Sequence, residues 1–507
     1  MNADARPIRV LLDMMRAADD GQAGIPQETR LLFRGLSLIG DVHIEGLMQS
    51  AERVLAAGLP PPGSAALARL PADEQLDRLG RIVISLEEGN WSSHPQAVLY
   101  TIAMAGWHLC GGRQTLSYFS NGWQFRDYLW RRFFALTLPA TDFELVTRGG
   151  FRVARMPWNA MNLCALATQA VGLPGLFVRL DTSDFDVMIA QTPYPATVSP
   201  STRLIVRYHD AIPMTMPQTI GQRRWHQRFH YQALRHSVAS GAWFACVSEA
   251  TRNQLLEIFP QAAPHSATIH NMVSHDYFDE ASTPERVPEI AGTRLIKTVQ
   301  RLLGQSMNRR RLDENPEATP PDYLLIVSRI DPRKNHLLLL SAWERLRSGR
   351  FPALQIIGVG LLGSHYEPIV RKFLPWVEQG VAHLLEDVPT ADLRLLYKHA
   401  RATICPSIAE GFDYSGVEAM RCGGAVVASD IPVHREIYGE AAVYFNPYDL
   451  DEAVHAIDTV IDPGQPALRA ELVDRGAAIS ARYQSVAIMP QWQAFLHTVM
   501  NAPTGPA

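Results

Sequence analysis

The sequence predicts an α/β protein that is built from two large domains with parallel β-sheets. Its 507 residues exceed the size of one ordinary domain, and a hydrophobic content of 47% is ample for two cores. Short apolar runs that are typical of buried strands alternate with helical segments in both halves of the chain. A strand, a helix and a second strand in this order form the unit from which parallel sheets are built.

The composition restricts the cellular compartment and the class of binding partner that we expect for the protein. A formal net charge of -4 gives no reason to expect a nucleic-acid partner. The five cysteines are widely spaced, odd in number and without a C-x-x-C pair, so we expect reduced thiols in a cytoplasmic protein and no zinc site. The N-terminus carries charges before and inside its apolar run, unlike a signal peptide, and we therefore expect no export.

Two strand ends in the first half could face a ligand. A strand predicted at residues 8–14 is followed by a loop that contains Gly24, and glycine lets a backbone approach a ligand closely, although turn geometry alone also explains it. A strand at 204–210 ends in His209 and Asp210, at the edge of the sheet where catalytic groups tend to lie. A histidine at a strand end is also explained as a hydrogen-bonded structural residue.

The strand pattern lapses twice. Residues 50–150 contain a proline-rich loop at 59–64 and otherwise read as a mainly helical insertion. Residues 283–321 are charged and contain proline, so we expect an interdomain segment with an extra helix there.

A cationic loop follows the strand that is predicted at 324–328. It contains Arg329, Arg333 and Lys334 and precedes a helix at 336–346. Arginine offers forked donors and lysine a movable charge, so the loop suits a diphosphate, while an ordinary charged turn is the alternative.

The clearest unit spans residues 402–430. A short strand leads into a polar loop that carries Glu410, and a helix that opens near Ser415 carries Glu418 before a glycine stop and a second strand. Both carboxylates therefore border the crevice at the carboxyl end of a parallel sheet, where ligands bind. The helix start between them offers free N–H groups and a positive dipole to an anion.

Residues 410–420 read Glu-Gly-Phe-Asp-Tyr-Ser-Gly-Val-Glu-Ala-Met and resemble the signature of the retaining GT-B glycosyltransferases of family 4, in which seven residues separate two glutamates. The following strand and Glu436 are also similar to that family. The resemblance implies a GT-B fold, in which two Rossmann-like, doubly wound domains face a central cleft. It implies these parts: an N-terminal acceptor-side domain at 1–282, an interdomain segment at 283–321, a nucleotide-sugar-binding domain at 322–482, and a terminal helix at 483–507 that packs back across the domains.

The resemblance also implies the roles of individual residues. His209 and Glu410 would be catalytic, with His209 beside the transferred sugar and Glu410 orienting it. Asp413 and Tyr414 depart from the Gly-Leu that relatives often carry there, so we expect them to alter the choice of sugar. The donor-binding residues that the resemblance implies are Gly24, Arg329, Lys334, Asp387, Val388, Gly411, Phe412, Asp413, Tyr414, Ser415, Gly416, Val417 and Glu418.

The co-substrate implied is a nucleotide-diphosphate sugar, with no cofactor and no metal. Asp184 and Asp186 form an Asp-x-Asp pair, but the pair opens a strand, so we interpret it as a solvated strand start. From the resemblance alone we expect mannose on guanosine diphosphate and a glycan or lipid-linked acceptor in bacterial surface polysaccharide synthesis. A nucleotide-sugar epimerase of the same fold and a catalytically silent, membrane-associated subunit are the alternatives.

Four segments raise the question of a membrane. The uncharged stretches 91–112 and 157–178 are long enough to span one, but their polar residues favour buried helices. The helices predicted at 125–134 and 222–236 mix arginines with aromatic residues, which fits contact with anionic lipid or, alternatively, a packed aromatic face. Peripheral contact with the inner face of the membrane is therefore one of two interpretations.

Overall fold

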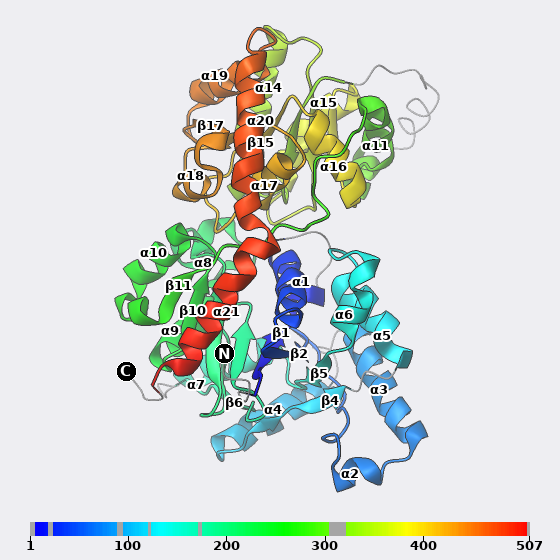
Figure 1. The fold of residues 1–507 in the computed structure, drawn as a ribbon, viewed down its shortest axis with the longest axis vertical. Helices are drawn as coiled ribbons and strands as arrows, with labels where there is room; N and C mark the ends of the chain where they lie inside the picture. The colour runs from blue at the N-terminus through cyan, green and yellow to red at the C-terminus, as the bar shows by residue number, and fades with distance from the viewer. Residues whose placement is uncertain are drawn as a thin grey trace.

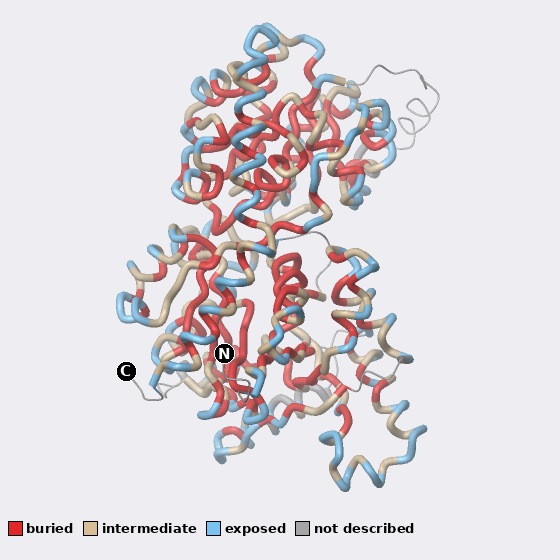
Figure 2. Tube along the Cα trace, viewed as in Figure 1, coloured by how far each residue is buried: buried red, intermediate tan, exposed pale blue. Residues whose placement is uncertain are grey.

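The computed structural model describes residues 6–18, 24–88, 95–119, 123–170, 175–303 and 321–503. Two domains, each built around a parallel sheet, lie one above the other (Figure 1). Buried residues follow the strands and the inward faces of the helices, and the exposed residues lie on the outer faces and loops (Figure 2). The α/β class with parallel sheets in both halves is as predicted.

The sheet of the first domain has the order β11-β10-β9-β7-β1-β2-β5-β4, and only the β4–β5 pair is antiparallel. The chain runs outward from β1 to one edge and then returns to β7 on the other side of β1, so the order reverses beside β1. Its strands are β1 (Ile8–Asp13), β2 (Val42–Met48), β4 (Ser117–Phe119), β5 (Gly150–Val153), β7 (Val187–Ala190), β9 (Arg203–Tyr208), β10 (Trp243–Cys246) and β11 (Ser266–Thr268).

Helices cover both faces of this sheet, and a small sheet of β3 (Gln114–Thr115), β6 (Val178–Asp181) and β8 (Ala196–Thr197) lies at its margin. Within residues 50–150, β4 adds a strand to the edge of the main sheet, so this segment is not only helical. The helices are α1 (Gly24–Ser37), α2 (Ala65–Ala68), α3 (Ala72–Glu87), α4 (Pro95–Leu109), α5 (Trp123–Leu129), α6 (Phe143–Thr147), α7 (Trp158–Ala170), α8 (Ile212–Thr215), α9 (Arg223–Ala239) and α10 (Glu249–Ile258).

The sheet of the second domain has the order β14-β13-β12-β15-β16-β17 and is parallel throughout. The order reverses between β12 and β15, which is the place where open α/β sheets bind ligands. Its strands are β12 (Tyr323–Val327), β13 (Gln355–Val359), β14 (Ala382–Leu385), β15 (Ala402–Cys405), β16 (Val426–Ser429) and β17 (Ala442–Phe445). Its helices are α14 (His336–Ser348), α15 (Glu367–Glu378), α16 (Thr390–His399), α17 (Tyr414–Arg421), α18 (Pro432–Tyr438), α19 (Leu450–Ile461) and α20 (Pro466–Ser480).

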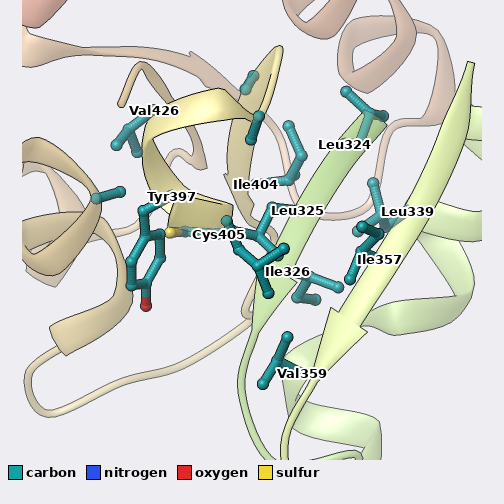
Figure 3. Close-up of a cluster of buried hydrophobic side chains, with 14 of the residues drawn as sticks. Leu324, Leu325, Ile326, Leu339, Ile357, Val359, Tyr397, Ile404, Cys405 and Val426 are labelled. Atoms are coloured by element: carbon teal, nitrogen blue, oxygen red, sulfur yellow. The ribbon is translucent and has the colours of Figure 1, made fainter. Parts of the chain in front are cut away.

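The strands of the second sheet are continuous apolar runs because helices cover both of their faces. Leu325 and Ile326 of β12 lie between Ile404 of β15 and Ile357 of β13, and all four side chains are buried (Figure 3). This packing fixes the carboxyl ends of β12 and β15 side by side.

The interdomain segment expected at 283–321 is only in part a connection. Helices α11 (Val287–Thr293) and α12 (Lys297–Leu303) pack into the core of the second domain through Val287, Ile290 and Val299. The rest of the segment, residues 304–320, lies outside the described residues.

Helix α21 (Ser485–Asn501) returns the chain to the first domain after α20 has packed against α17 of the second. Its apolar face buries Trp492, Leu496 and Val499 in the core of the first domain. The Trp492 ring also lies 5.3 Å from the guanidinium of Arg207, which is a cation–π contact.

The two uncharged stretches differ in their burial. Helix α7 packs into the first domain through Ala160, Met161 and Ala165, whereas α4 exposes large apolar side chains on one face. The prediction of a buried helix is therefore wrong for α4. Among the described residues, no helix combines the length and the apolar character that crossing a bilayer requires.

We expect Trp492→Ala to lower the free energy of unfolding by about 3–5 kcal/mol, because it leaves a large cavity in the first core. Val486→Ala, on the exposed side of the same helix, is the matched control and should change it by less than about 0.5 kcal/mol. Urea titrations followed by circular dichroism measure both. Equal stability of the two variants would contradict this packing.

Candidate active site

The candidate site lies where the two sheets end opposite each other. His209 follows β9 of the first domain, and Glu410 lies in the loop between β15 and α17 of the second. A Cβ added at Gly411 would lie 1.7 Å from the carbonyl oxygen of His209, so only glycine permits this approach of the two backbones. The Thr251 hydroxyl also donates a hydrogen bond to the Gly411 carbonyl across the domains, at 3.4 Å.

Glu410 is a buried carboxylate that is held between two cations. Its oxygens lie 2.7 Å from Nη1 of Arg333 and 2.5 Å from Nζ of Lys334. Burial opposes ionisation of Glu410, but the charges of Arg333 and Lys334 outweigh it and lower the pKa of the carboxyl below its ordinary value. Glu410 is therefore ionised at neutral pH.

The cations are positioned by the turn that follows β12. Asp331 caps a short 3-10 turn (Pro332–Lys334) by accepting a hydrogen bond from the Arg333 amide, and Asn335 then turns the chain into α14 with φ 57°. The Arg333 side chain also donates to the Ala409 carbonyl at 2.6 Å, and the Ile408 amide donates to the Arg333 carbonyl at 2.9 Å. The cationic turn and the Glu410 loop thus brace each other.

The sequence predicted Arg329 and Lys334 as the diphosphate ligands. Lys334 lies on Glu410, whereas Arg329 is exposed at the end of β12. Its role as a phosphate ligand stays a prediction. Arg333, which the structure places on Glu410, was not selected from the sequence, although it belongs to the same cationic loop.

Asp413 is the N-cap of α17 and a second buried carboxylate on which the charge of Lys334 acts. It accepts hydrogen bonds from the amide and the hydroxyl of Ser415, at 3.2 Å and 2.7 Å, and lies 3.3 Å from Nε2 of His434. Burial disfavours its charge, but Lys334 and His434 hold the pKa of Asp413 well below its ordinary value. The charge of Lys334 therefore acts on both carboxylates, and its ammonium contacts Glu410.

Glu418 lies on the inner side of α17 and is almost fully buried. It accepts hydrogen bonds from Gln27 of the first domain at 3.2 Å and from the Tyr397 hydroxyl at 2.9 Å. Burial raises the pKa of Glu418 to about 7 although both hydrogen bonds favour the charged form. Its predicted contact with a ribose stays a prediction, and it would replace the contact with Gln27.

Between Asp413 and Glu418, the helix start is packed too tightly for larger residues. A Cβ at Gly416 would lie 2.3 Å from the Tyr438 ring. Val417 is buried, and Phe412 lies in edge contact with Tyr414 and Tyr483.

A buried network joins the domains behind this loop. Glu28 of α1 and Arg207 of β9 form an ion pair of 2.8 Å with both side chains fully buried, and the Tyr414 hydroxyl donates to Glu28 at 3.2 Å. Burial raises the pKa of Glu28, and Arg207 opposes part of that rise. Gly24, the first residue of α1, lies against the Tyr414 ring. A Cβ added at Gly24 would lie 3.4 Å from carbon atoms of that ring.

His209 is the residue of the first domain for which the sequence predicted a catalytic role. Its Nε2 lies 3.2 Å from the side-chain oxygen of Gln191. Burial, together with the charges of Arg207 and Arg16, lowers the pKa of His209 well below its ordinary value, so the imidazole is neutral at pH 7. A neutral imidazole can either donate to or accept from a sugar hydroxyl.

Two further predicted positions lie at the same edge of the second sheet. Asp387 follows β14 with φ 53°, and its carbonyl accepts a hydrogen bond from Arg294 at 3.0 Å, while Val388 is buried. These backbone groups stay predicted contacts of the nucleotide base.

The Asp-x-Asp pair is engaged in structural contacts. Asp186 is buried and accepts from Arg6 at 2.8 Å and from the Arg9 amide at 2.9 Å, and Asp184 accepts from Arg152 at 2.9 Å. The interpretation as a solvated strand start is therefore wrong for Asp186.

A second set of hydrogen bonds between the domains lies outside the Glu410 loop. Glu436 of α18 accepts hydrogen bonds from the Glu249 and Ala250 amides at the start of α10, at 2.7 Å and 3.0 Å. His270 lies 2.8 Å from the same carboxylate. The carboxylate thus satisfies free N–H groups at a helix start of the other domain.

Comparison with known proteins gives a family match in the second domain. The model of glycosyl transferases group 1 matches residues 308–477, about a third of the chain. Escherichia coli O-antigen chain mannosyltransferase B is 26% identical over 261 residues, which are 51% of this chain and 62% of that protein. Serotype-specific mannosyltransferase WbdA of the same species is 22% identical over 280 residues, which are 54% of this chain and 31% of that protein. Both matches thus span less than two thirds of the relative.

Solved structures match nearly the whole chain. Sucrose-phosphate synthase from Thermosynechococcus elongatus has a TM-score of 0.55 at 13% identity, covering 98% of this chain and all of that one. Anabaena HepE, solved in complex with UDP-glucose, has a TM-score of 0.53 at 14% identity, with 97% and 100% covered. At such identities the likeness concerns the fold alone, and it confirms the predicted GT-B arrangement.

We expect the stability of the protein to depend on pH through Glu418. Its pKa is raised from 4.5 to about 7 by folding, so between these values the native state holds a proton that the unfolded chain has lost. Stability should then fall as the pH rises through this window, by roughly 3 kcal/mol from this group.

Glu418→Gln keeps the hydrogen-bond acceptor and removes the titration. Urea titrations at pH 4.5 and 7.5 should therefore show a smaller loss of stability in the variant than in the native protein. The same loss in both proteins would contradict the burial of an uncharged Glu418.

Proposed function

We propose that the protein is a retaining glycosyltransferase of family 4, which moves a hexose from a nucleotide-diphosphate sugar to a glycan or lipid-linked acceptor in bacterial surface polysaccharide synthesis. The observation that carries this proposal is the buried cluster of Glu410, Arg333 and Lys334 at the point where the second sheet reverses its order. It lies in backbone contact with the His209 segment of the other domain. The likeness to O-antigen mannosyltransferases favours mannose as the hexose, and guanosine diphosphate is the carrier that we expect with it.

The chemistry follows from where charge develops. When the bond between the sugar and the diphosphate breaks, negative charge grows on the leaving oxygens and positive charge on the anomeric carbon. Preorganised cations on the leaving group are the most effective aid that a protein gives to such a step. Lys334, Arg333 and Arg329 follow the same strand end, and the amides that open α17 add a positive dipole.

Glu410 holds two of these cations before the donor binds. When the diphosphate enters, its oxygens replace Glu410 as a partner of Lys334, and the carboxylate becomes available to the sugar. Because the pKa of Glu410 is lowered, the group stays ionised and favours the oxocarbenium-like state of the transferred sugar. The neutral His209 imidazole would bind a hydroxyl of the same sugar from the acceptor side.

Retention is proposed from the resemblance, by attack of the acceptor on the face that the diphosphate leaves. The departing phosphate oxygen would take the proton of the acceptor hydroxyl, so no second carboxylate is required as a base. Asp413, fixed by Ser415 and His434, would accept hydrogen bonds from the sugar. It is the residue that we expect to read the identity of the sugar.

We also propose that no metal ion takes part, because cationic side chains stand at the expected diphosphate position. Turnover that is unchanged by a chelator would agree with a metal-independent reaction, and turnover that requires an added divalent cation would contradict it.

Contact with the cytoplasmic face of the membrane is part of the proposal when the acceptor is lipid-linked.

The direct test is nucleotide release from a panel of nucleotide sugars, with and without a mannose-containing glycan acceptor. We expect release from guanosine diphosphate mannose that depends on the acceptor, with retained configuration in the product by NMR. Interconversion of the donor without acceptor would indicate an epimerase. Absence of binding by every donor in a thermal-unfolding assay would indicate a silent subunit.

We expect Lys334→Ala and Glu410→Gln each to lower kcat by about 100-fold or more, since each removes charge from the proposed reacting centre. Lys297→Ala is the matched control, because this lysine is exposed and lies on α12. Circular dichroism should show that all three variants fold. Near-normal turnover in either site variant would refute the assignment.

A further inference from the structure

Helix α4 carries no Asp, Glu, Lys or Arg, although it lies on the surface of the first domain. Its inner face packs against the domain through Met104 and Ala105, and His108, a residue of the same helix, is buried. A surface helix of a globular protein ordinarily turns charged residues outward. The outer face of α4 therefore lacks the side chains that contact with water favours.

Large apolar side chains take their place on that outer face. Leu99, Ile102, Trp107 and Leu109 are exposed by 65%, 63%, 57% and 67%. Exposed apolar patches of this kind on a single element mark a surface that another phase or molecule covers. Tryptophan in particular is enriched at the boundary between lipid and water.

A hollow of about 420 Å³ adjoins the same helix and carries positive charge. Arg179 and Arg235 line it together with His108 and His236, and none of the described residues that line it is a carboxylate. Burial lowers the pKa of His236 to about 4, so the positive charge near pH 7 comes from the two arginines. Arginine binds phosphate oxygens with paired N–H donors.

The length of α4 decides how it could meet a bilayer. Its 15 residues extend about 22 Å, which is shorter than the roughly 30 Å of a hydrocarbon core. Such a helix lies in the plane of the interface, with its apolar side chains at the boundary between headgroups and acyl chains. The helix is at the end of the first domain that is farthest from the second domain (Figure 1).

We propose that α4 and the adjoining arginine-lined hollow form a docking surface for an anionic phospholipid bilayer. Leu99, Ile102, Trp107 and Leu109 enter the interface, and Arg179 and Arg235 bind lipid phosphates. A bilayer is the occupant that we infer, because its apolar chains lie next to phosphate groups and so fit both features. This surface stands apart from the proposed active site, and the inference does not depend on the reaction catalysed there.

Cys110 makes the test direct. It is the exposed one of five cysteines, the other four being buried, and it follows α4 immediately. An environment-sensitive dye on Cys110 should shift its emission to the blue with vesicles that contain phosphatidylglycerol. Phosphatidylcholine vesicles should give a weaker shift, and added salt should reduce the shift on anionic vesicles.

Variants separate the two components of the surface. The combined variant Leu99→Ser, Ile102→Ser and Trp107→Ser should abolish sedimentation with anionic vesicles. The double variant Arg179→Gln with Arg235→Gln should bind anionic vesicles about 25-fold more weakly. Each cation near an anionic surface contributes about fivefold to the affinity. Tyr448→Ser with Val486→Ser, two apolar residues that are exposed elsewhere, is the matched control and should sediment like the native protein.

Three outcomes would overturn the proposal. The first is no dye shift with any vesicle, and the second is a shift with inorganic phosphate alone, which would indicate a soluble anion. The third is a dimer in analytical ultracentrifugation that the α4 variant abolishes, which would indicate a second copy of the chain on this face. Turnover with a soluble acceptor should be the same in the α4 variant and the native protein, so failure here is distinct from failure of the proposed function.

Discussion

The structure of the site depends on one interaction, the buried carboxylate of Glu410 between Arg333 and Lys334. A carboxylate without a partner would be protonated at this depth, and two cations without it would repel each other. Together they make a site in which the opposite charges nearly cancel, because Asp413 compensates the second cation. In the proposed function this cluster receives the diphosphate of the donor, and the anion takes the place of a carboxylate that is already there.

The fold explains why these groups meet. In each sheet the strand order reverses beside the first strand, and the segments that follow the neighbouring strands diverge at that point. The cationic turn follows β12, the Glu410 loop follows β15, and the His209 segment reaches them from β9 of the other domain. The lack of a side chain at Gly411 allows the final approach, and the buried Glu28–Arg207 pair with Tyr414 fixes α1 and β9 behind it.

Local patterns in the sequence predicted the strands, the helix starts and the positions of Glu410 and Lys334, because strand ends and caps are encoded by neighbouring residues. Contacts between distant segments were not predictable in this way. Nothing in the sequence indicates that Glu28 pairs with Arg207, 179 positions away, or that Gln27 reaches Glu418. Arg329 and Arg333 lie in the same loop, and no local sequence feature distinguishes them. The turn that Asp331 and Asn335 impose determines which of the two contacts Glu410. For α4, an uncharged run predicts burial, and only the packing shows which face the domain leaves uncovered.

In the proposed function, Glu410 and the diphosphate of the donor compete for the same cations. Calorimetric titration of the nucleoside diphosphate into the native protein and into Glu410→Gln measures this competition directly. We expect tighter binding of the diphosphate by the variant, because its cations are no longer held by a carboxylate. Weaker binding by the variant would show that Glu410 supports the nucleotide and does not exchange with it, which would contradict the proposed competition.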